Sequence, residues 1–374
     1  KLKQQDAIFV GKVNLDEFAM GLSTEFSAYG PSKNPWNTDY VPGGSSGGSA
    51  VSVSAFECVA SLGSDTGGSV RNPASFCSTV GYKPTYGLIS RYGLISYANS
   101  IEQIGPLTRT VEDAAFMLNL IAGLDSNDNT TVDNNNEDYL KDINSGIEGK
   151  KIGIIKEMIG EGIDPAVLSA TKDAISKLEG LGATCEEISL DMVKYSVAAY
   201  YTITATEAGS NLARYDNLRY GYDFSVEGYE FNSYIERARK KLGPEVTRRM
   251  ILGGFVPSAG HAGKYFLKAL KVKSKLTRQI NDAFKKFDLL ISPTVPILPF
   301  KIGEKINDPV ALFLVDINTV TANLTGKPAI SIPYALSNGL PIGIQLIANS
   351  MNDKLLLQAA YALEKTVKLP EVPI

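Results

Sequence analysis

Short apolar runs alternate with amphipathic stretches along most of the chain, and this alternation limits the possible fold more than any other feature. The runs Lys151–Lys156, Ile330–Tyr334 and Ile342–Ala348 are typical of buried strands. The stretches that precede Asp288 and follow Asn352 instead repeat their apolar residues with a helical period. Strands interleaved with helices predict an α/β fold in which helices flank one mixed central β-sheet.

The same pattern indicates the domain organisation. A chain of 374 residues is long enough for one large α/β domain, and we expect residues 1–374 to form a single domain. Residues from about 190 to 287 are expected to be almost entirely helical, which indicates a helical insertion on the sheet. The first apolar run, Ala7–Val10, is expected to be a short buried strand. Because it directly follows a short polar opening, we expect the chain to lack the N-terminal part of its domain.

Charge and composition argue against several classes of function. Lysine and arginine number 37 and acidic residues 40, so the formal net charge of −3 predicts no basic face and argues against nucleic-acid binding by this chain alone. No run of about eighteen apolar residues occurs, which argues against a membrane span. The single histidine, His261, lacks partners for a metal cluster and is expected to be an ordinary helix residue. His261 alone could act as an imidazole base, and if the protein is a hydrolase we expect its base to be another residue.

Two glycine-serine clusters, Gly43–Ala50 and Gly63–Arg71, carry the most informative chemistry. Flexible loops would explain their composition, but both clusters lie between apolar segments, where glycine provides unusual dihedral angles or close backbone approach. Neither contains the lysine of a phosphate-binding P-loop, and neither has the acidic residue that follows a dinucleotide-binding turn. The remaining interpretation is nucleophilic catalysis by a serine beside glycine N–H groups that form an oxyanion hole.

These clusters, together with the following segments Asn72–Cys77 and Gly81–Gly87, resemble the amidase signature family. The similarity is dense over residues 7–124 and returns in 288–364. The resemblance implies an amidase-signature fold and a catalytic triad of a serine, a cis-serine and a lysine, which needs no histidine.

The resemblance also assigns roles to individual residues. Ser69 corresponds to the nucleophile, and Ser45 corresponds to the cis-serine that relays its proton. The oxyanion hole corresponds to main-chain N–H groups of the second cluster, namely those of Thr66, Gly67, Gly68 and Ser69.

The third member of the triad has no counterpart in the sequence. In the family, the catalytic lysine lies upstream of the strand that corresponds to Ala7–Val10, in a segment that residues 1–374 do not contain. Lys12, Lys33 and Lys83 belong to other parts of the pattern. The triad is therefore expected to be incomplete in the chain as it stands.

Later stretches, including Glu207–Asp216 and Asn323–Ile330, are similar to the branch of the family that supplies glutaminase subunits to tRNA-dependent amidotransferases. Three substrate-recognition residues of that branch map onto Tyr200, Arg249 and Asp316. A guanidinium offers a planar fork to the α-carboxylate of glutamine, and a carboxylate receives its α-ammonium group. A helix-surface ion pair would also explain Arg249, and a place in the core would explain Tyr200.

For a chain of this branch, the resemblance implies glutamine hydrolysis that supplies ammonia for the conversion of Glu-tRNA(Gln) to Gln-tRNA(Gln). Two partners are implied, the B subunit of the amidotransferase and a small accessory subunit, with tRNA reached only through the complex and no membrane contact. No cofactor is expected in this chain, and ATP and Mg²⁺ are expected in the partner subunit. Asparagine-rich loops favour the mitochondrial matrix over a bacterial cytoplasm as the location.

Two alternatives remain open from the sequence. A free-standing amidase that acts on another small amide would share the serine core, and a partner-independent rate on simple aliphatic amides would favour it. A non-catalytic scaffold subunit would keep the fold without the lysine, and the gene sequence upstream of Lys1 would decide that question.

Overall fold

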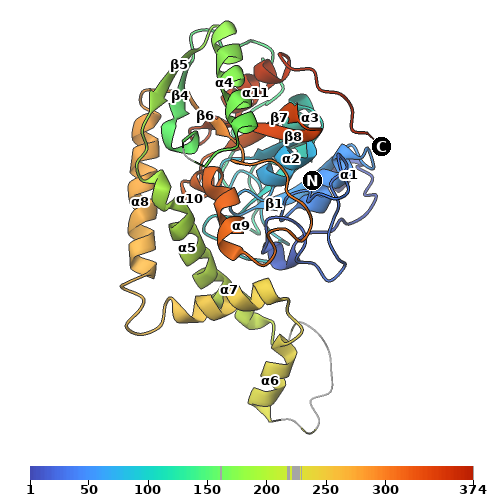
Figure 1. The fold of residues 1–374 in the computed structure, drawn as a ribbon, viewed down its shortest axis with the longest axis vertical. Coiled ribbons are helices and arrows are strands. Elements are labelled where there is room, and N and C mark those ends of the chain that lie inside the picture. Colours follow the sequence, from blue (N-terminus) through green and yellow to red (C-terminus); the bar gives the residue numbers. More distant parts are fainter. Residues whose placement is uncertain (161, 217–219, 221–227, 229, 374) are drawn as a thin grey trace.

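In the part of the chain that the structure describes, eight strands form one mixed β-sheet at the centre of the molecule (Figure 1). This computed structural model describes residues 1–160, 162–216, 220, 228 and 230–373. The strands span Ala60–Asp65 (β1), Val80–Lys83 (β2), Gln103–Thr108 (β3), Lys151–Ile155 (β4), Thr184–Ile188 (β5), Leu289–Pro293 (β6), Ala329–Ser337 (β7) and Leu340–Ala348 (β8). Their order across the sheet is β1-β3-β2-β7-β8-β6-β4-β5.

Parallel and antiparallel neighbours occur in the same sheet. β7 and β8 form a long antiparallel pair, in which Ala329 lies opposite Ile347 and Ser337 lies opposite Leu340. β4 instead runs parallel to both of its neighbours, β5 and β6. The expectation of a mixed central sheet is therefore confirmed.

Helices cover both faces of the sheet, because successive side chains of a strand point to opposite sides. The α-helices span Gly47–Ser54 (α1), Arg71–Cys77 (α2), Val111–Ile121 (α3), Pro165–Gly180 (α4), Ser196–Asn211 (α5), Phe231–Arg239 (α6), Pro244–Phe255 (α7), Phe266–Ala283 (α8), Pro309–Val315 (α9), Val320–Leu324 (α10) and Asp353–Glu364 (α11). In β6, Leu289 and Ile291 belong to the core formed with α3, α4 and α11, whereas Leu290 belongs to the core formed with α5, α8 and α10. All three side chains are fully buried.

The described residues between β5 and β6 form the helices α5, α6, α7 and α8 together with short 3-10 helices and the turns that join them. α5 and α8 pack against each other beside the sheet, and α6 and α7 extend away from it (Figure 1). This segment corresponds to the helical insertion expected over about 190–287, of which residues 217–219, 221–227 and 229 lie outside the described part of the chain.

Two expectations about local structure are wrong. Residues Ala7–Val10 do not form a strand, and Ile8 is 90% exposed. A strand needs a hydrogen-bonding neighbour as well as apolar residues, and no strand of the described sheet pairs with this run. His261 lies in a turn between α7 and α8 rather than in a helix, and its ring packs against Phe255 and Tyr265.

Several features bear on the kind of protein this is. None of the helices that the structure describes has both the length and the apolar character needed to cross a bilayer. The same residues include no group of three or more histidine, cysteine or acidic side chains placed to hold a metal ion. The three cysteines, Cys58, Cys77 and Cys185, are free thiols.

Candidate active site

The first glycine-serine cluster forms the turn that leads into α1. Gly43 has a φ of +79°, a conformation that glycine adopts without the steric cost of a Cβ. The peptide bond between Gly44 and Ser45 is cis, as the family resemblance implies. Ser45 and Ser46 are both buried. The turn thus holds two neighbouring hydroxyl groups in the protein interior.

Hydrogen bonds distinguish these two serines. Ser46 joins the two clusters, because its N–H donates to Ser69 O at 3.1 Å and its Oγ accepts from the N–H of Ser64 at 3.2 Å. The buried Oγ of Ser45 has no hydrogen-bond partner among the described residues. A buried hydroxyl without a partner costs about 1–3 kcal/mol, and such groups call for a functional explanation. Ser45, rather than Ser46, therefore has a hydroxyl available for proton transfer.

The second cluster connects β1 to α2 and carries Ser69. Gly68 has a φ of +142°, and a Cβ at this position would clash with the side chain of Thr319. In the described part of the chain, the N–H groups of Gly67, Gly68 and Ser69 donate to no acceptor. Free N–H groups beside a serine are the arrangement that stabilises an oxyanion.

A buried ion pair fixes the two ends of this loop. Arg71 Nη2 lies 2.9 Å from Asp65 Oδ1, and both side chains are fully buried. Burial by itself would raise the pKa of Asp65, but the guanidinium of Arg71 holds that pKa below its ordinary value. Asn323 donates a further hydrogen bond to Asp65 Oδ1 at 2.8 Å. This ion pair was not predicted from the sequence. The signal that could have indicated it is the presence of opposite charges at the two ends of a loop of small residues.

Two of the three expected substrate-binding residues approach the oxyanion loop from other elements. Tyr200 in α5 is buried against Gly67, where an added Cβ would lie 2.5 Å from Tyr200 Oη. Asp316, at the end of α9, is connected to the loop by Thr319, whose Oγ1 lies 2.5 Å from Gly67 O and 3.4 Å from Asp316 Oδ1. Burial raises the pKa of the Asp316 carboxyl well above its ordinary value. Thr319 belongs to no pattern that predicts its bridging position.

Arg249, in α7, is buried with its guanidinium between an acidic and an aromatic group. Its Nε donates to Glu245 Oε1 at 2.6 Å, and its Nη1 donates to Tyr97 Oη at 2.5 Å. An ion pair on the helix is therefore present, but it lies in the interior rather than at the surface. The charge of Arg249 also acts on the carboxyl of Asp316. No hydrogen bond among the described residues uses its Nη2.

A loop that precedes the first cluster holds that cluster in place. Thr24 Oγ1 donates to Gly43 O at 2.8 Å and accepts from the N–H of Gly47 at 3.0 Å. The N–H of Asp16 donates to Ser45 O at 3.1 Å. Burial raises the pKa of the Asp16 carboxyl to about 7. Neither Asp16 nor Thr24 is expected from the sequence, because these contacts join residues that no local pattern relates.

The structure does not bring Lys12, Lys33 or Lys83 to the candidate serines. Lys12 and Lys33 are exposed. Lys83 is buried, and its Nζ donates to Pro84 O at 3.0 Å. Burial, and secondarily the charge of Arg71, lower the pKa of Lys83 to about 7. Among the described contacts, none joins this ammonium group to a serine of either cluster.

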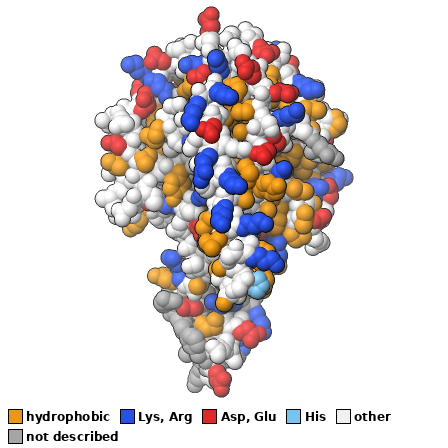
Figure 2. All heavy atoms as spheres, turned by 90° about the vertical axis from the view of Figure 1, so that its left-hand side faces the viewer, with side chains coloured by type: hydrophobic (Ala, Val, Ile, Leu, Met, Phe, Trp, Pro, Cys, Tyr) orange, Lys and Arg blue, Asp and Glu red, His pale blue; other side chains and the backbone are white. Residues whose placement is uncertain are grey.

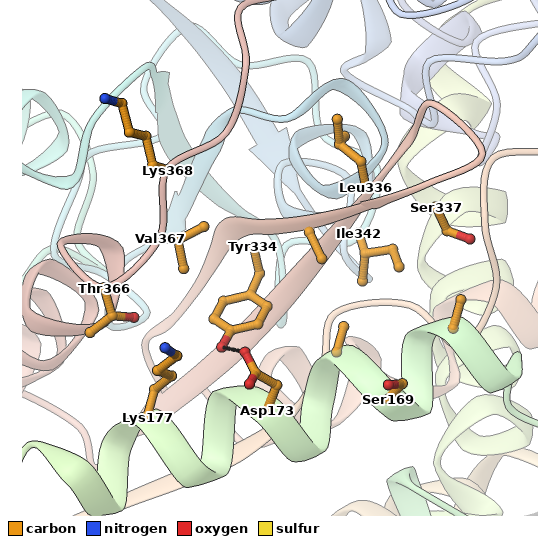
Figure 3. A pocket seen from close by; sticks show the side chains of 13 residues that line it. Ser169, Asp173, Lys177, Tyr334, Leu336, Ser337, Ile342, Thr366, Val367 and Lys368 are labelled. Atoms are coloured by element: carbon orange, nitrogen blue, oxygen red, sulfur yellow. Dashed lines mark hydrogen bonds between the residues drawn. The ribbon is translucent and has the colours of Figure 1, made fainter.

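Two cavities open at separate places among the described residues. The larger, of about 580 Å³, is lined by Glu25–Ala28, Glu245 and Arg248, and it therefore borders the carboxylate that holds Arg249. The smaller, of about 450 Å³, lies between α4 and β7, where Tyr334 Oη donates to Asp173 Oδ2 at 2.6 Å (Figure 3). None of the residues that line the smaller cavity belongs to a glycine-serine cluster. The smaller cavity is therefore separate from the candidate serines.

Comparison with known proteins establishes the family. A family model described as Amidase matches residues 1–357. The chain belongs to the amidase family. This membership confirms the family resemblance and, with the observed sheet, the expected fold class.

The similarity to individual members of this family extends over the whole chain. The chain is 66% identical, over all of its length and 78% of the relative's, to the A subunit of the glutamyl-tRNA(Gln) amidotransferase of Cenarchaeum symbiosum. It superposes with a TM-score of 0.84 on the crystal structure of the corresponding A subunit of Thermotoga maritima, at 44% identity over 100% of this chain and 78% of that one. A bacterial aryl acylamidase of the amidase signature family shares the fold at 26% identity and a TM-score of 0.81, over 97% of this chain and 74% of the acylamidase.

Proposed function

We propose that this amidase-family chain is the glutaminase subunit of a glutamyl-tRNA(Gln) amidotransferase. The observation that carries the proposal is the convergence of Tyr200 and Asp316 on the oxyanion loop at Gly67, with Arg249 in the same electrostatic environment. An α-carboxylate and an α-ammonium group are the features that a guanidinium and a carboxylate bind together. The relatives at 66% and 44% identity, both glutamyl-tRNA(Gln) amidotransferase A subunits, support this substrate.

In the proposed reaction, Ser69 is the nucleophile. Its Oγ attacks the side-chain amide carbon of glutamine, and the oxyanion accepts hydrogen bonds from the N–H groups of Thr66, Gly67, Gly68 and Ser69. The proton of Ser69 passes through the hydroxyl of Ser45 to the lysine that the resemblance places upstream of residue 1. The C–N bond then breaks, the leaving group takes a proton and departs as ammonia, and a γ-glutamyl ester remains on Ser69. Water hydrolyses that ester to glutamate and restores the serine.

The ammonia is used by a partner in this proposal. The B subunit of the amidotransferase would activate Glu-tRNA(Gln) with ATP and Mg²⁺, a small accessory subunit would complete the assembly, and tRNA would be bound in the context of the complex. The relative from Cenarchaeum symbiosum and the homologue from Thermotoga maritima support a prokaryotic location. The mitochondrial matrix stays an expectation from the asparagine-rich loops.

A free-standing amidase is the second candidate, and the shared fold of the aryl acylamidase favours it. The two candidates differ in how they treat the α-substituents of the substrate. An enzyme that uses Arg249 and Asp316 for recognition should prefer glutamine to an aliphatic amide without α-amino and α-carboxyl groups. The free-standing candidate should hydrolyse both at similar rates, without a partner.

The test is to label the nucleophile in the full-length protein assembled with its partner subunits. A glutamine-derived electrophile should modify Ser69, as mapped by mass spectrometry, and Ser69→Ala should abolish both labelling and glutaminase activity while the complex still assembles. Ser75→Ala is a suitable control, because that buried serine lies on the neighbouring helix α2. Labelling at a residue other than Ser69, or equal activity on glutamine and acetamide, would contradict the proposal.

A further inference from the structure

The segment that contains α8 is basic although the whole chain is slightly acidic. Positions 264–286 hold eight of the chain's 37 lysine and arginine residues and one of its 40 acidic residues, Asp282. The net charge of −3 predicts no basic face, and the structure contradicts that expectation, because a total charge does not show how charges are distributed.

The cations of α8 lie on one face of the helix. Lys268, Lys271, Lys275 and Arg278 are all exposed, and they follow one another at alternating intervals of three and four residues. That spacing places them in one row along a helix, about 15 Å long at 1.5 Å per residue. Figure 2 shows lysine and arginine side chains in a column along the side of the molecule that α8 forms.

The opposite face of α8 explains why the basic row points outward. The buried residues of this helix are Ala269, Leu276, Ile280 and Ala283, and α8 packs with them against α5. Apolar residues at these positions fix the rotation of the helix about its axis. The row is therefore held on the surface by the same packing that anchors the helix to the domain.

The row has no acidic partner among the residues that the structure describes. Within the described part of the chain, none of its four cations takes part in an ion pair. The nearby Asp282 is paired with Lys285, at 2.7 Å. Some lysines elsewhere do have acidic partners, as Lys240 does with Glu236 at 3.0 Å and Lys354 with Glu137 at 2.9 Å. The row thus presents uncompensated positive charge over several helical turns.

We propose that this basic row binds phosphates of the tRNA backbone when the chain is part of its amidotransferase complex. The inference rests on the proposed function, which makes a tRNA the substrate of the complex. Lysine side chains act as point charges toward phosphate, and regularly spaced lysines along a helix suit a polyanion of regular charge spacing. Lysine is depleted from protein–protein interfaces, so a row composed mainly of lysine favours RNA over an acidic protein surface.

The experiment measures tRNA binding by the assembled full-length complex. Lys268→Gln, Lys271→Gln and Lys275→Gln are combined in one variant, and a control variant replaces three exposed lysines elsewhere, Lys33, Lys172 and Lys177, with glutamine. The probe is an unmodified tRNA(Gln) transcript, titrated between about 50 and 200 mM salt.

The row variant should bind this transcript at least about tenfold more weakly. The slope of log K against log salt should become shallower by about 2, since each lost phosphate contact reduces the magnitude of this slope by about 0.7–0.9. The control variant should keep the wild-type slope. Glutaminase activity without tRNA should be unchanged in both, because the row includes none of the candidate catalytic residues.

Three results would overturn the proposal. An unchanged affinity and slope would show that the row does not contact tRNA. Dissociation of the row variant's complex in size-exclusion chromatography would assign the row to an acidic protein partner. Binding of the wild-type complex to vesicles that contain anionic lipid, but not to the transcript, would assign the row to a membrane. Failure of the wild-type complex to hydrolyse glutamine would instead refute the proposed function, and the activity measurement detects that failure separately from the tRNA titration.

Discussion

Replacement of Thr24 by valine tests whether the geometry of the first glycine-serine cluster controls the reaction. Thr24 is fully buried, and its hydroxyl bridges the two sides of the turn that carries Ser45. It donates to Gly43 O at 2.8 Å and accepts from the N–H of Gly47 at 3.0 Å. Valine has nearly the same shape as threonine, so the substitution removes these two hydrogen bonds, together with a longer one of 3.4 Å to Ser45 O, without opening a cavity.

The expected loss of stability follows from the two hydrogen bonds to Gly43 and Gly47. Each lost bond leaves a buried backbone group without a partner, which costs about 1–3 kcal/mol, so the free energy of unfolding should fall by about 2–6 kcal/mol. Because the same turn positions the hydroxyl of Ser45, part of the loss should appear in the reaction barrier. A share of about 1.4 kcal/mol lowers the rate tenfold. We therefore expect kcat for glutamine to fall at least about tenfold while KM changes little, since Thr24 is not among the substrate-binding residues.

The assay compares Thr24→Val with Thr24→Ser in the full-length complex. Serine keeps the hydroxyl and loses a methyl group, so Thr24→Ser should recover most of kcat even where its stability stays reduced. Denaturant unfolding of both variants separates stability from catalysis. A valine variant with wild-type kcat and lowered stability would refute the positioning role, and so would a serine variant as slow as the valine variant.

Two further predictions concern substrate recognition. Arg249→Ala should raise the free energy barrier of the glutamine-dependent reaction by about 2–4 kcal/mol, because a charge-assisted contact is lost. The substitution should have little effect when an ammonium salt replaces glutamine. Equal loss of activity with both donors would show that the role of Arg249 is structural. The raised pKa of Asp316 means that its carboxyl is protonated at low pH and receives an ammonium group only after ionisation, so KM for glutamine should decrease as pH rises through that pKa. Asp316→Asn should raise KM and remove this pH dependence, and a pH profile of KM that matches the wild type would contradict the assignment.

The fold class, which the structure confirms, can be predicted from the sequence, and so can the position of the two glycine-serine clusters. Apolar runs mark β7 and β8, and apolar residues at a helical period mark α11, so the local sequence alone places these elements. The glycines near Ser45 and Ser69 are also visible in the sequence. Glycine permits positive φ values, and the structure shows φ values of +79° at Gly43 and +142° at Gly68. The single histidine leaves His261 as the one imidazole in this sequence that could act as a base, and composition alone gives that count.

The tertiary structure alone decided which groups meet. The resemblance assigns the relay to Ser45, and only the folded chain shows that Ser46 is bonded to Ser69 O, because that bond depends on how two loops pack. The bridge from Thr319 to Gly67 spans 252 positions, a separation over which no periodic pattern carries information. Desolvation of Asp316 and the charged face of α8 likewise arise from packing, since burial and neighbouring charge are properties of the folded chain and not of its composition.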